Sequence, residues 1–453
     1  MSDEARLLAA IIDAPDDDDP RLVYADWLQT RGDPRGEFIQ LQCQLAAAPD
    51  DERRRAIKIL ENKLFATHGE GWLAPIREAI PANEIAPHKL EFARGFVEEA
   101  QLTLDCVPHF EALWAKAPLL RRLRLSPKMY VDFPVPKPSL EGVLDAPQLG
   151  RLQMLELHLP GVGNAGARSV AQASNLSELR TLELQFSIWG EGVGIFPSGT
   201  TDLALDDAGV SELSRAKGLA GLETLDIDSN RITSLGVAAI ADGHWRLRRL
   251  DLGNNNLEPA TLARSLEGPA LAKLEVLGLV GTTFDPESIA ALVSSPALAH
   301  LRELDLERCH LGVEGIEALC KHLALPALRS LRLERNALCD KGALAISECA
   351  AFSRLTNLEA GHNLMGQKAA VALSSSPYLV NLERLTLNEP RWKPETTALF
   401  AASPTLAKAK IYLGGRLMGR KKTSPGVMEE GVSARAKPKA ARAKSKSPAS
   451  KRG

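Results

Sequence analysis

The chain has 453 residues, of which 45% are hydrophobic, 25% charged and only 5% aromatic, and its formal net charge is −2. This length exceeds one average domain unless the chain is a repeat array, and the hydrophobic share can bury a large aliphatic core. No run of about 18 apolar residues occurs, which excludes a predicted membrane helix, and the acidic start MSDEARLLAA lacks the apolar region of a secretory signal peptide.

The first predicted elements are helices. Apolar residues recur at helical spacing over residues 3–13, after Pro20, around Phe38 and near residues 51–66. Gly32 and the Asp-Pro dipeptide behind it predict the turn between the second and third helices. The chain therefore begins with a small all-helical segment.

The segment LVYADWLQTRGDPRGEFIQLQ, residues 22–42, is rich in acidic and basic side chains. It holds no histidine and no nucleophile beside a base, so we interpret its charges as structural rather than catalytic. With the preceding LLAAIIDAPDDDDPR, it resembles the repeat-companion domain found before leucine-rich repeats in large bacterial families, notably of myxobacteria and planctomycetes. The resemblance covers about residues 3–46 and implies a repeat array downstream but no chemistry. Because an open solenoid end exposes its core, we expect residues 1–80 to form an N-terminal cap.

Residues 90–415 carry a recurring Leu-x-x-Leu-x-Leu frame. From Leu222 to Leu382 its starts lie 25, 27, 27, 27, 27 and 27 residues apart. The frame begins at Leu120, Leu152, Leu179, Leu222, Leu247, Leu274, Leu301, Leu328, Leu355 and Leu382, with degenerate copies from Val97 and Leu406. This pattern resembles the leucine-rich repeats of the ribonuclease-inhibitor-like class, which have a full helix in each unit. We predict an α/β solenoid with parallel strands on the concave face and helices on the convex face.

Each unit has a second signature behind its strand. An Asn recurs there, and we expect its side-chain amide to hydrogen-bond backbone groups of neighbouring turns. The residues at this position are Asn230, Asn255, Cys309, Asn336 and Asn363, and Cys309 is expected to replace the Asn as a small buried residue. In GVEGIEALCKHLALPAL, residues Ile316, Leu319 and Leu323 follow helical spacing, and Pro326 ends the helix.

Two motifs that could bind a ligand have simpler interpretations. GVGNAG, residues 161–166, matches the dinucleotide fingerprint G-x-G-x-x-G, but other repeats place comparable loops at the same position. Cysteines and histidines gather between Cys309 and Cys349 without zinc spacing, which favours core packing. We therefore predict no cofactor, no metal and no enzymatic activity. Because the six cysteines form no CxxC pair, we expect a reduced, cytoplasmic location.

The residue between the last two apolar positions of each repeat is expected on the concave face. Down the array it reads Arg124, Glu156, Glu183, Asp226, Asp251, Gly278, Asp305, Arg332, Glu359 and Thr386. Six of these ten are acidic, and Asp228, Glu307 and Glu334 add charge to the same face. Parallel strands lie about 4.8 Å apart, so these carboxylates repel one another and a cationic partner would relieve the repulsion. The alternative is that acidic residues are an ordinary preference on a solvated face.

The step from Leu179 to Leu222 is 43 residues, so this repeat carries an insertion. A long loop in a solenoid is often a binding element, and this one offers Trp189 and Phe196. The alternative is that these aromatics pack on the solenoid itself.

The C-terminal segment 416–453 holds 12 Lys and Arg against two Glu, whereas the rest of the chain holds 43 basic and 55 acidic residues. With almost no large apolar residues, it is predicted to be a disordered basic tail. It could bind nucleic acid weakly, fold back onto the acidic body or aid solubility.

These features predict a non-enzymatic scaffold that binds a protein with a basic patch. The predicted contact residues are Glu156, Glu183, Trp189, Phe196, Asp226, Asp228, Asp251 and Asp305. Charge reversal at Asp226 and Asp251 together should abolish partner capture. One alternative, from the family resemblance alone, is a regulator of a small GTPase, which nucleotide-state-dependent binding would distinguish. Another is a nucleic-acid-associated protein that acts through its tail.

Overall fold

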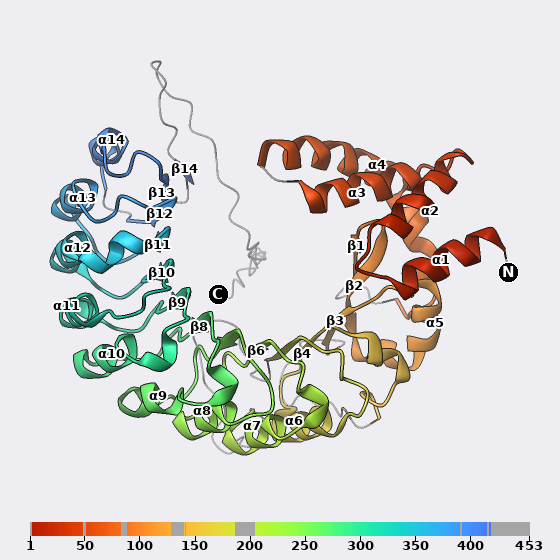
Figure 1. Ribbon diagram of the computed structural model, residues 1–453, viewed down its shortest axis with the longest axis horizontal. Coiled ribbons are helices and arrows are strands. Elements are labelled where there is room, and N and C mark those ends of the chain that lie inside the picture. Colours follow the sequence, from red (N-terminus) through yellow and green to blue (C-terminus); the bar gives the residue numbers. More distant parts are fainter. Residues whose placement is uncertain are drawn as a thin grey trace, which may run out of the picture.

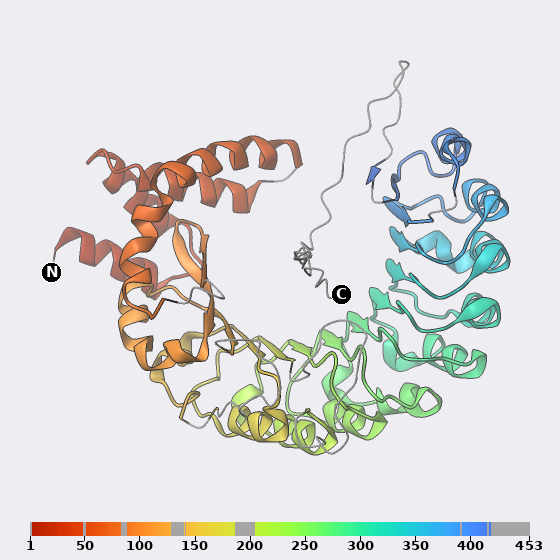
Figure 2. The ribbon, with the colours of Figure 1, turned by 180° about the vertical axis from the view of Figure 1, so that it is seen from behind.

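The computed structural model describes residues 2–48, 51–82, 88–127, 140, 142–185, 204–389, 392–414 and 416–417. These residues form an open arc, with strands along its inner side and helices along its outer side (Figures 1 and 2). The described strands form one 14-stranded sheet whose order follows the chain from β1 to β14. This is the architecture of a leucine-rich repeat solenoid, so the predicted fold class is confirmed.

The strands are short because each repeat contributes only its Leu-x-Leu segment before the chain turns away. From β2 to β13 all neighbours are parallel. The degenerate copies form β2 and β13, whereas antiparallel β1 and β14, at the two ends of the described sheet, were not predicted. The strands are β1 Lys89–Ala93, β2 Phe96–Thr103, β3 Arg122–Ser126, β4 Met154–His158, β5 Thr181–Gln185, β6 Thr224–Asp226, β7 Arg249–Asp251, β8 Val276–Gly278, β9 Glu303–Asp305, β10 Ser330–Arg332, β11 Asn357–Glu359, β12 Arg384–Leu387, β13 Lys410–Leu413 and β14 Arg416–Leu417.

Helices cover the outer side of the sheet. Several begin at a side chain that accepts a hydrogen bond from a backbone N–H of the first turn, as Thr233 does from Leu235. The helices of the repeats are α5 Phe110–Lys116, α6 Gly163–Gln172, α7 Asp207–Ser214, α8 Ser234–Ala241, α9 Pro259–Ser265, α10 Pro286–Val293, α11 Gly312–His322, α12 Cys339–Glu348, α13 Gln367–Ser374 and α14 Pro394–Ala402. Within the described ranges, no helix combines the length and apolarity that crossing a bilayer requires.

A continuous aliphatic core fills the space between sheet and helices. The strand leucines stack from repeat to repeat, and Leu250, Leu277 and Leu304 are fully buried. Behind each strand the recurring asparagine forms hydrogen bonds with backbone groups of neighbouring turns. The Asn336 amide, for example, donates to the carbonyls of Leu306 at 2.7 Å and Leu333 at 3.0 Å. Cys309 takes the same position, and its thiol donates to the Leu279 carbonyl at 3.2 Å. The role predicted for the Asn and Cys positions is confirmed.

Four helices precede the sheet, at the other tip of the arc from α14 (Figure 1). They are α1 Asp3–Asp13, α2 Asp19–Gln29, α3 Arg35–Ala47 and α4 Asp51–Arg77. The first three match the predicted positions, and α4 continues beyond the expected end near residue 66. Gly95, in the turn between β1 and β2, has φ +88°, and a Cβ there would lie 2.1 Å from Ile39 of α3. Only glycine lets this turn approach the helix so closely.

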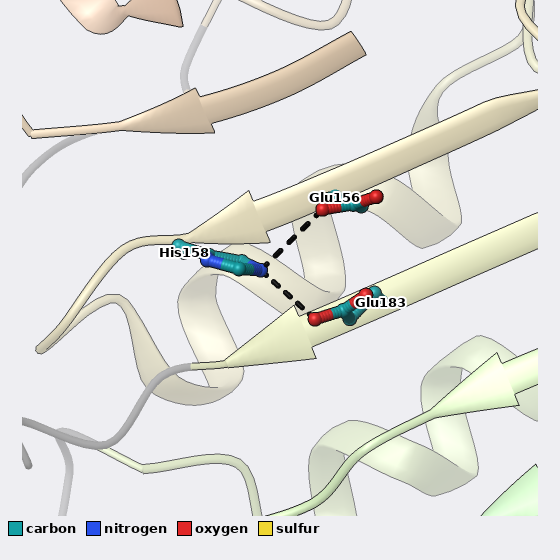
Figure 3. Close-up of side chains that lie close together, drawn as sticks. All are labelled: Glu156, His158 and Glu183. Atoms are coloured by element: carbon teal, nitrogen blue, oxygen red, sulfur yellow. Dashed lines mark hydrogen bonds and ion pairs between the residues drawn. The ribbon is translucent and has the colours of Figure 1, made fainter. Parts of the chain in front are cut away.

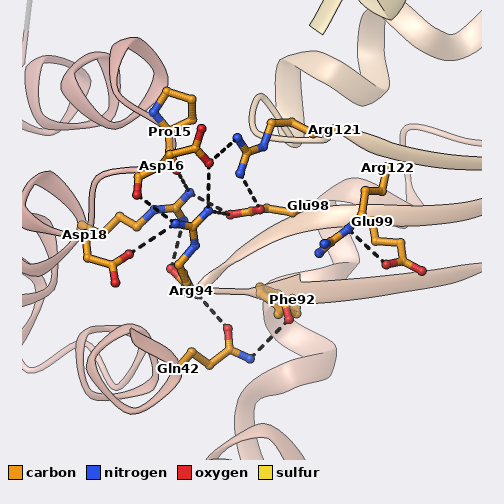
Figure 4. A network of polar contacts seen from close by, with 12 residues as sticks. Pro15, Asp16, Asp18, Gln42, Phe92, Arg94, Glu98, Glu99, Arg121 and Arg122 are labelled. Carbon is orange, nitrogen blue, oxygen red and sulfur yellow. Dashed lines mark hydrogen bonds and ion pairs between the residues drawn. The ribbon is translucent and has the colours of Figure 1, made fainter. Parts of the chain in front are cut away.

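A buried ion network joins these helices to the first strands (Figure 4). Glu98 of β2 accepts from Arg21 of α2 at 2.7 Å and from Arg121 at 3.0 Å. Arg94 lies 3.5 Å from the same carboxylate. Arg21 is fully buried, and this burial lowers the pKa of its guanidinium despite the opposing effect of Glu98. The network shows that the helices are fixed to the solenoid by buried charge as well as by apolar packing.

Candidate functional site

The ten residues predicted for the concave face do form one row across the sheet. Each is paired in register with the next, beginning with Arg124 opposite Glu156 and ending with Glu359 opposite Thr386. We call this set the central row. The parallel pairing brings Asp226 directly beside Asp251, and Glu183 directly beside Asp226. The repeat period thus creates a line of adjacent carboxylates.

Arginines neutralise this line on both sides of its middle. Arg124 of β3 hydrogen-bonds Glu156 of β4. On the other side, Arg332 of β10 lies 2.8 Å from Asp305 and 3.4 Å from Glu359. The same guanidinium is 3.6 Å from Glu307 and 3.8 Å from Glu334. Glu156 and Asp305, two of the predicted contact residues, therefore already have cationic partners within the chain.

Between these arginines lie Glu183, Asp226, Asp228 and Asp251, which we call the acidic cluster. Among the residues that the structure describes, no Lys or Arg forms an ion pair with Asp226, Asp228 or Asp251. Their hydrogen bonds come from neutral donors. Asp226 accepts from the backbone N–H of Asp228 at 3.0 Å, and Asp228 accepts from the Asn254 amide at 2.9 Å. These bonds hold the three aspartates in place, and in the described part of the chain no Lys or Arg pairs with them.

The absence of a side chain at a glycine makes room for one carboxylate of the acidic cluster. In β8 the central row has Gly278, and a Cβ built there would lie 2.6 Å from a carboxylate oxygen of Asp251. The Asp251 side chain therefore lies against Gly278, where any larger residue would displace it. This role of Gly278 was not predicted, because the sequence pattern only showed a missing acid.

The crowding of carboxylates changes their protonation. Burial and, after it, the neighbouring Asp251 together raise the pKa of Asp226 to about 8. Burial also raises the pKa of Asp228. Beside Arg332, burial raises the pKa of Asp305 to about 6, although the arginine opposes this shift. Near neutral pH the cluster therefore retains a proton that a nearby cation would displace.

The cluster lines a groove of about 470 Å³ on the inner side of the arc. Of the eight predicted contact residues, five line this groove: Glu183, Asp226, Asp228, Asp251 and Asp305. Glu156 lies beside it in β4, and Trp189 and Phe196 lie outside the described residues. The groove is not uniformly acidic, because Arg124, Arg308, Arg332 and Arg335 also line it. Among the described residues, the groove carboxylates without a Lys or Arg partner lie in strands β5 to β7 and directly after β6.

Glu156, His158 and Glu183 bring three potential metal ligands together at one edge of the groove (Figure 3). Their ligand atoms lie within 4.8 Å of one another. Each is already engaged, since Arg124 bonds Glu156, and Glu183 accepts from Gln185 at 3.1 Å. His158 Nε2 lies 2.9 Å from Glu183 and 3.7 Å from Glu156. His158 was not among the predicted contact residues, and its position bridging two carboxylates explains how they tolerate each other.

The charged residues of the N-terminal motif make local contacts. Asp33 accepts from the backbone N–H of Arg35 at 2.8 Å, and Asp26 accepts from the Gln40 amide at 2.8 Å. The Arg31 guanidinium stacks 3.8 Å from the centre of the Trp27 ring. These contacts hold the corner between α2 and α3, in agreement with the structural interpretation.

The replacement Arg332→Gln tests how strongly one arginine holds its four carboxylates. We expect a loss of stability on the order of 2 kcal/mol at pH 8 and a smaller loss at pH 5. The sign follows from pKa values of about 6 for Asp305 and about 7 for Glu334, which are raised by burial, so both carboxyls gain charge across this range. Urea unfolding at both pH values measures the effect. Arg302→Gln, which loses only an exposed pair with Glu275 at 3.7 Å, is the control. Equal losses at the two pH values would contradict this account.

Comparison with known proteins agrees with the repeat architecture. A leucine-rich repeat family model matches residues 222–241 and 297–320. The first match covers β6 and α8, and the second covers β9 and most of α11. Among curated proteins, no sequence matches the chain.

Solved structures similar to this chain include three repeat proteins with low sequence identity. TLR13 in a complex with ssRNA13 has 19% identity and a TM-score of 0.33, covering 67% of this chain and 50% of its own. Yeast Rad7, solved in a complex with Elc1, has 16% identity and a TM-score of 0.34, covering 65% and 72%. An internalin from Listeria monocytogenes has 14% identity and a TM-score of 0.34, covering 76% and 93%. This chain thus spans half the length of the TLR13 chain.

Proposed function

We propose that this chain is a non-enzymatic protein-interaction scaffold whose acidic cluster binds a lysine- and arginine-rich segment of a partner protein. One observation supports this most directly. Glu183, Asp226 and Asp251 are adjacent in the sheet, and Asp228 follows directly after β6. Among the described residues no Lys or Arg forms an ion pair with these four carboxylates, whereas the carboxylates on both sides have arginine partners. If the acidic residues of the concave face served only solubility, there would be no reason for these four carboxylates to lack arginine partners among the described residues. A cationic segment in the groove would neutralise the carboxylates that no Lys or Arg of the described residues pairs with.

The groove is large enough for a few side chains of a partner but too small for a folded domain. About 470 Å³ accommodates a few lysine or arginine side chains, and the flanking Arg124 and Arg332 limit the cationic segment to strands β5 to β7. We retain Trp189 and Phe196 as proposed apolar anchors beside this segment, and Glu156 as a residue at its edge. A small GTPase as the partner stays a prediction that rests on the family resemblance alone.

We also infer that helices α1 to α4 cap the N-terminal end of the solenoid. Tyr24 and Ile39 of these helices share a buried apolar cluster with Phe96 of β2 and with Leu119. Without this cover, the first repeat would expose its core. In this assignment, residues 1–80 are the cap, residues 90–415 the binding solenoid and residues 416–453 a basic tail.

A decalysine peptide is a suitable probe for the groove. We use a chain ending at Leu417, because deleting residues 418–453 removes no described residue and leaves no tail to compete. Replacing Asp226 and Asp251 together with Asn is expected to weaken decalysine binding by about tenfold or more at low salt, because the charge of Asp251 is removed and residue 226 can no longer ionise beside the peptide. Isothermal titration calorimetry measures the two affinities.

The matched control is Glu314→Gln with Glu348→Gln, which removes two charges from exposed positions on the outer helices α11 and α12. This variant is expected to bind decalysine as the parent chain does, because both glutamates lie on the outer helices, away from the groove, and attraction between charges falls with distance. If both double variants bound equally, attraction would come from net charge alone and the proposed site would be wrong. A decaglutamate peptide should bind neither the parent chain nor the control variant.

A further inference from the structure

The chain itself contains a segment with the chemistry that the acidic cluster would bind. Between Arg435 and Arg452 there are eight Lys and Arg and no acidic residue. We propose that this basic segment occupies the groove of its own chain and competes with the partner for the acidic cluster. This inference rests on the proposed function, because it assigns a resident ligand to the same site.

The tail is long enough to reach the cluster. In the sheet order, β14 is seven strands from β7, which corresponds to roughly 34 Å at about 4.8 Å per strand. Arg435 lies 18 positions after Leu417 in the sequence, and a chain of that length spans up to about 60 Å when extended. The connection is therefore long enough without requiring a stretched chain. A tether of this kind gives an effective concentration near the millimolar range, so even weak intrinsic affinity would keep the groove occupied.

The spacing of charges also fits. Arg435, Lys437 and Lys439 alternate with other residues, so an extended backbone places them on one side, roughly 7 Å apart. Glu183 and Asp251 are separated by one strand, β6, and hence by about 10 Å across the sheet. Two or three consecutive cations can therefore face the cluster at once. Arg124 and Arg332, at the two borders of the acidic cluster, repel any further Lys or Arg of the basic segment.

The other dense group of carboxylates is a weaker candidate. Residues 16–19 are four consecutive aspartates. Asp16 already accepts from Arg121 at 2.8 Å, and Asp18 lies 3.5 Å from Arg94. These aspartates contact the segments beside β2, which is twelve strands from β14. Because Asp16 and Asp18 already have arginine partners and lie more strands away from β14, the acidic cluster is the better docking site for the tail.

Trypsin provides a direct readout in the full-length chain, because it cleaves after the Lys and Arg residues that would be protected. After nuclease treatment, at about 20 mM salt, the rate of cleavage between Arg435 and Lys446 is followed by mass spectrometry. We expect this rate to rise at least fivefold in the chain with Asp226→Asn and Asp251→Asn. The chain with Glu314→Gln and Glu348→Gln should retain the slow rate. Equal rates in the wild type and the groove variant would overturn the inference.

Decalysine titration separates this inference from the proposed function. With the tail docked, the full-length chain should bind decalysine at least fivefold more weakly than the chain ending at Leu417. Replacing Lys437, Lys439, Lys444 and Lys446 with Gln in the full chain should restore the tighter binding. If the shorter chain binds decalysine through the cluster but tail removal changes nothing, the proposed function stands and the inference is wrong. If protection disappears on nuclease treatment, the tail was covered by nucleic acid and the inference is also wrong.

Discussion

Replacing Glu98 with Gln is expected to destabilise the N-terminal end of the molecule by roughly 3–5 kcal/mol, because it leaves buried arginines without their shared counter-charge. Arg21 is fully buried and Arg121 nearly so, and both donate to this carboxylate. Glutamine keeps the shape and one acceptor oxygen but removes the negative charge. Hydrogen exchange of the α1 to α3 amides should therefore accelerate by about 100-fold or more.

The neighbouring residue is a matched control for this prediction. Glu99 is in the same strand but points to the other side, where it pairs with Arg122 at 3.2 Å and both side chains are partly exposed (Figure 4). Glu99→Gln should change stability by less than about 0.5 kcal/mol, as is usual for such surface pairs. Faster exchange confined to the helices in Glu98→Gln would support their assignment as a cap that is locked by this network. Similar effects of the two substitutions would show that the buried network contributes little.

The sequence predicted the arrangement of the central row because the repeat period fixes which residues are neighbours. Once the frame is aligned from Leu222 to Leu382, Asp226 must lie beside Asp251, and the structure pairs them in that register. The same reasoning predicted the buried Asn336 and Asn363, whose bonds depend only on their position in the repeat. Features that recur with the period were therefore accessible without coordinates.

Features that depend on side-chain reach or on a single position were not accessible in this way. Arg332 looked like one exception in an acidic row, yet its length lets it reach carboxylates of both neighbouring strands, Asp305 and Glu359, and also Glu334 behind its own strand. Nor did the pattern show that Gly278 makes room for Asp251. The true cluster is therefore smaller than the predicted set, because neutralisation depends on distances that a repeat alignment does not contain.

The ends of the array also differ from the expectation. Helix α4 was predicted only to near residue 66, and beyond that point it contains Gly69, Gly71 and Pro75, which disfavour helix. Leu73 and Ile76 are nonetheless buried in the core of the solenoid. Tertiary packing thus outweighs local propensity here. Strands β1 and β14 lack the repeat sequence pattern. Strand β1 pairs antiparallel with β2, and β14 pairs antiparallel with β13.

In the chain ending at Leu417, which has no tail to occupy the groove, replacing Asp226 with Asn is expected to increase stability at alkaline pH. In the folded chain, burial and the neighbouring Asp251 raise the pKa of Asp226 to about 8, against an ordinary value of 3.8. Between these two values the folded chain holds a proton that the unfolded chain has lost, so rising pH favours unfolding. The variant should be more stable than the wild type by on the order of 2 kcal/mol at pH 8.5 and nearly equal to it at pH 4. Urea unfolding at a series of pH values measures this difference, and Asp242→Asn, at the exposed end of α8, is the control.

The same proton links stability to binding. A lysine side chain beside the acidic cluster favours the ionised form of Asp226, so occupation of the groove should release this proton. Calorimetric titrations of the chain ending at Leu417 with decalysine at pH 7.5, in buffers of different ionisation enthalpy, would detect the release. Asp226→Asn should bind decalysine with little or no proton release, whereas Asp242→Asn should release as the wild type does. A wild-type chain that binds decalysine without releasing a proton would show that the peptide does not contact Asp226, because the carboxyl would otherwise have to give up its proton to pair with the cation.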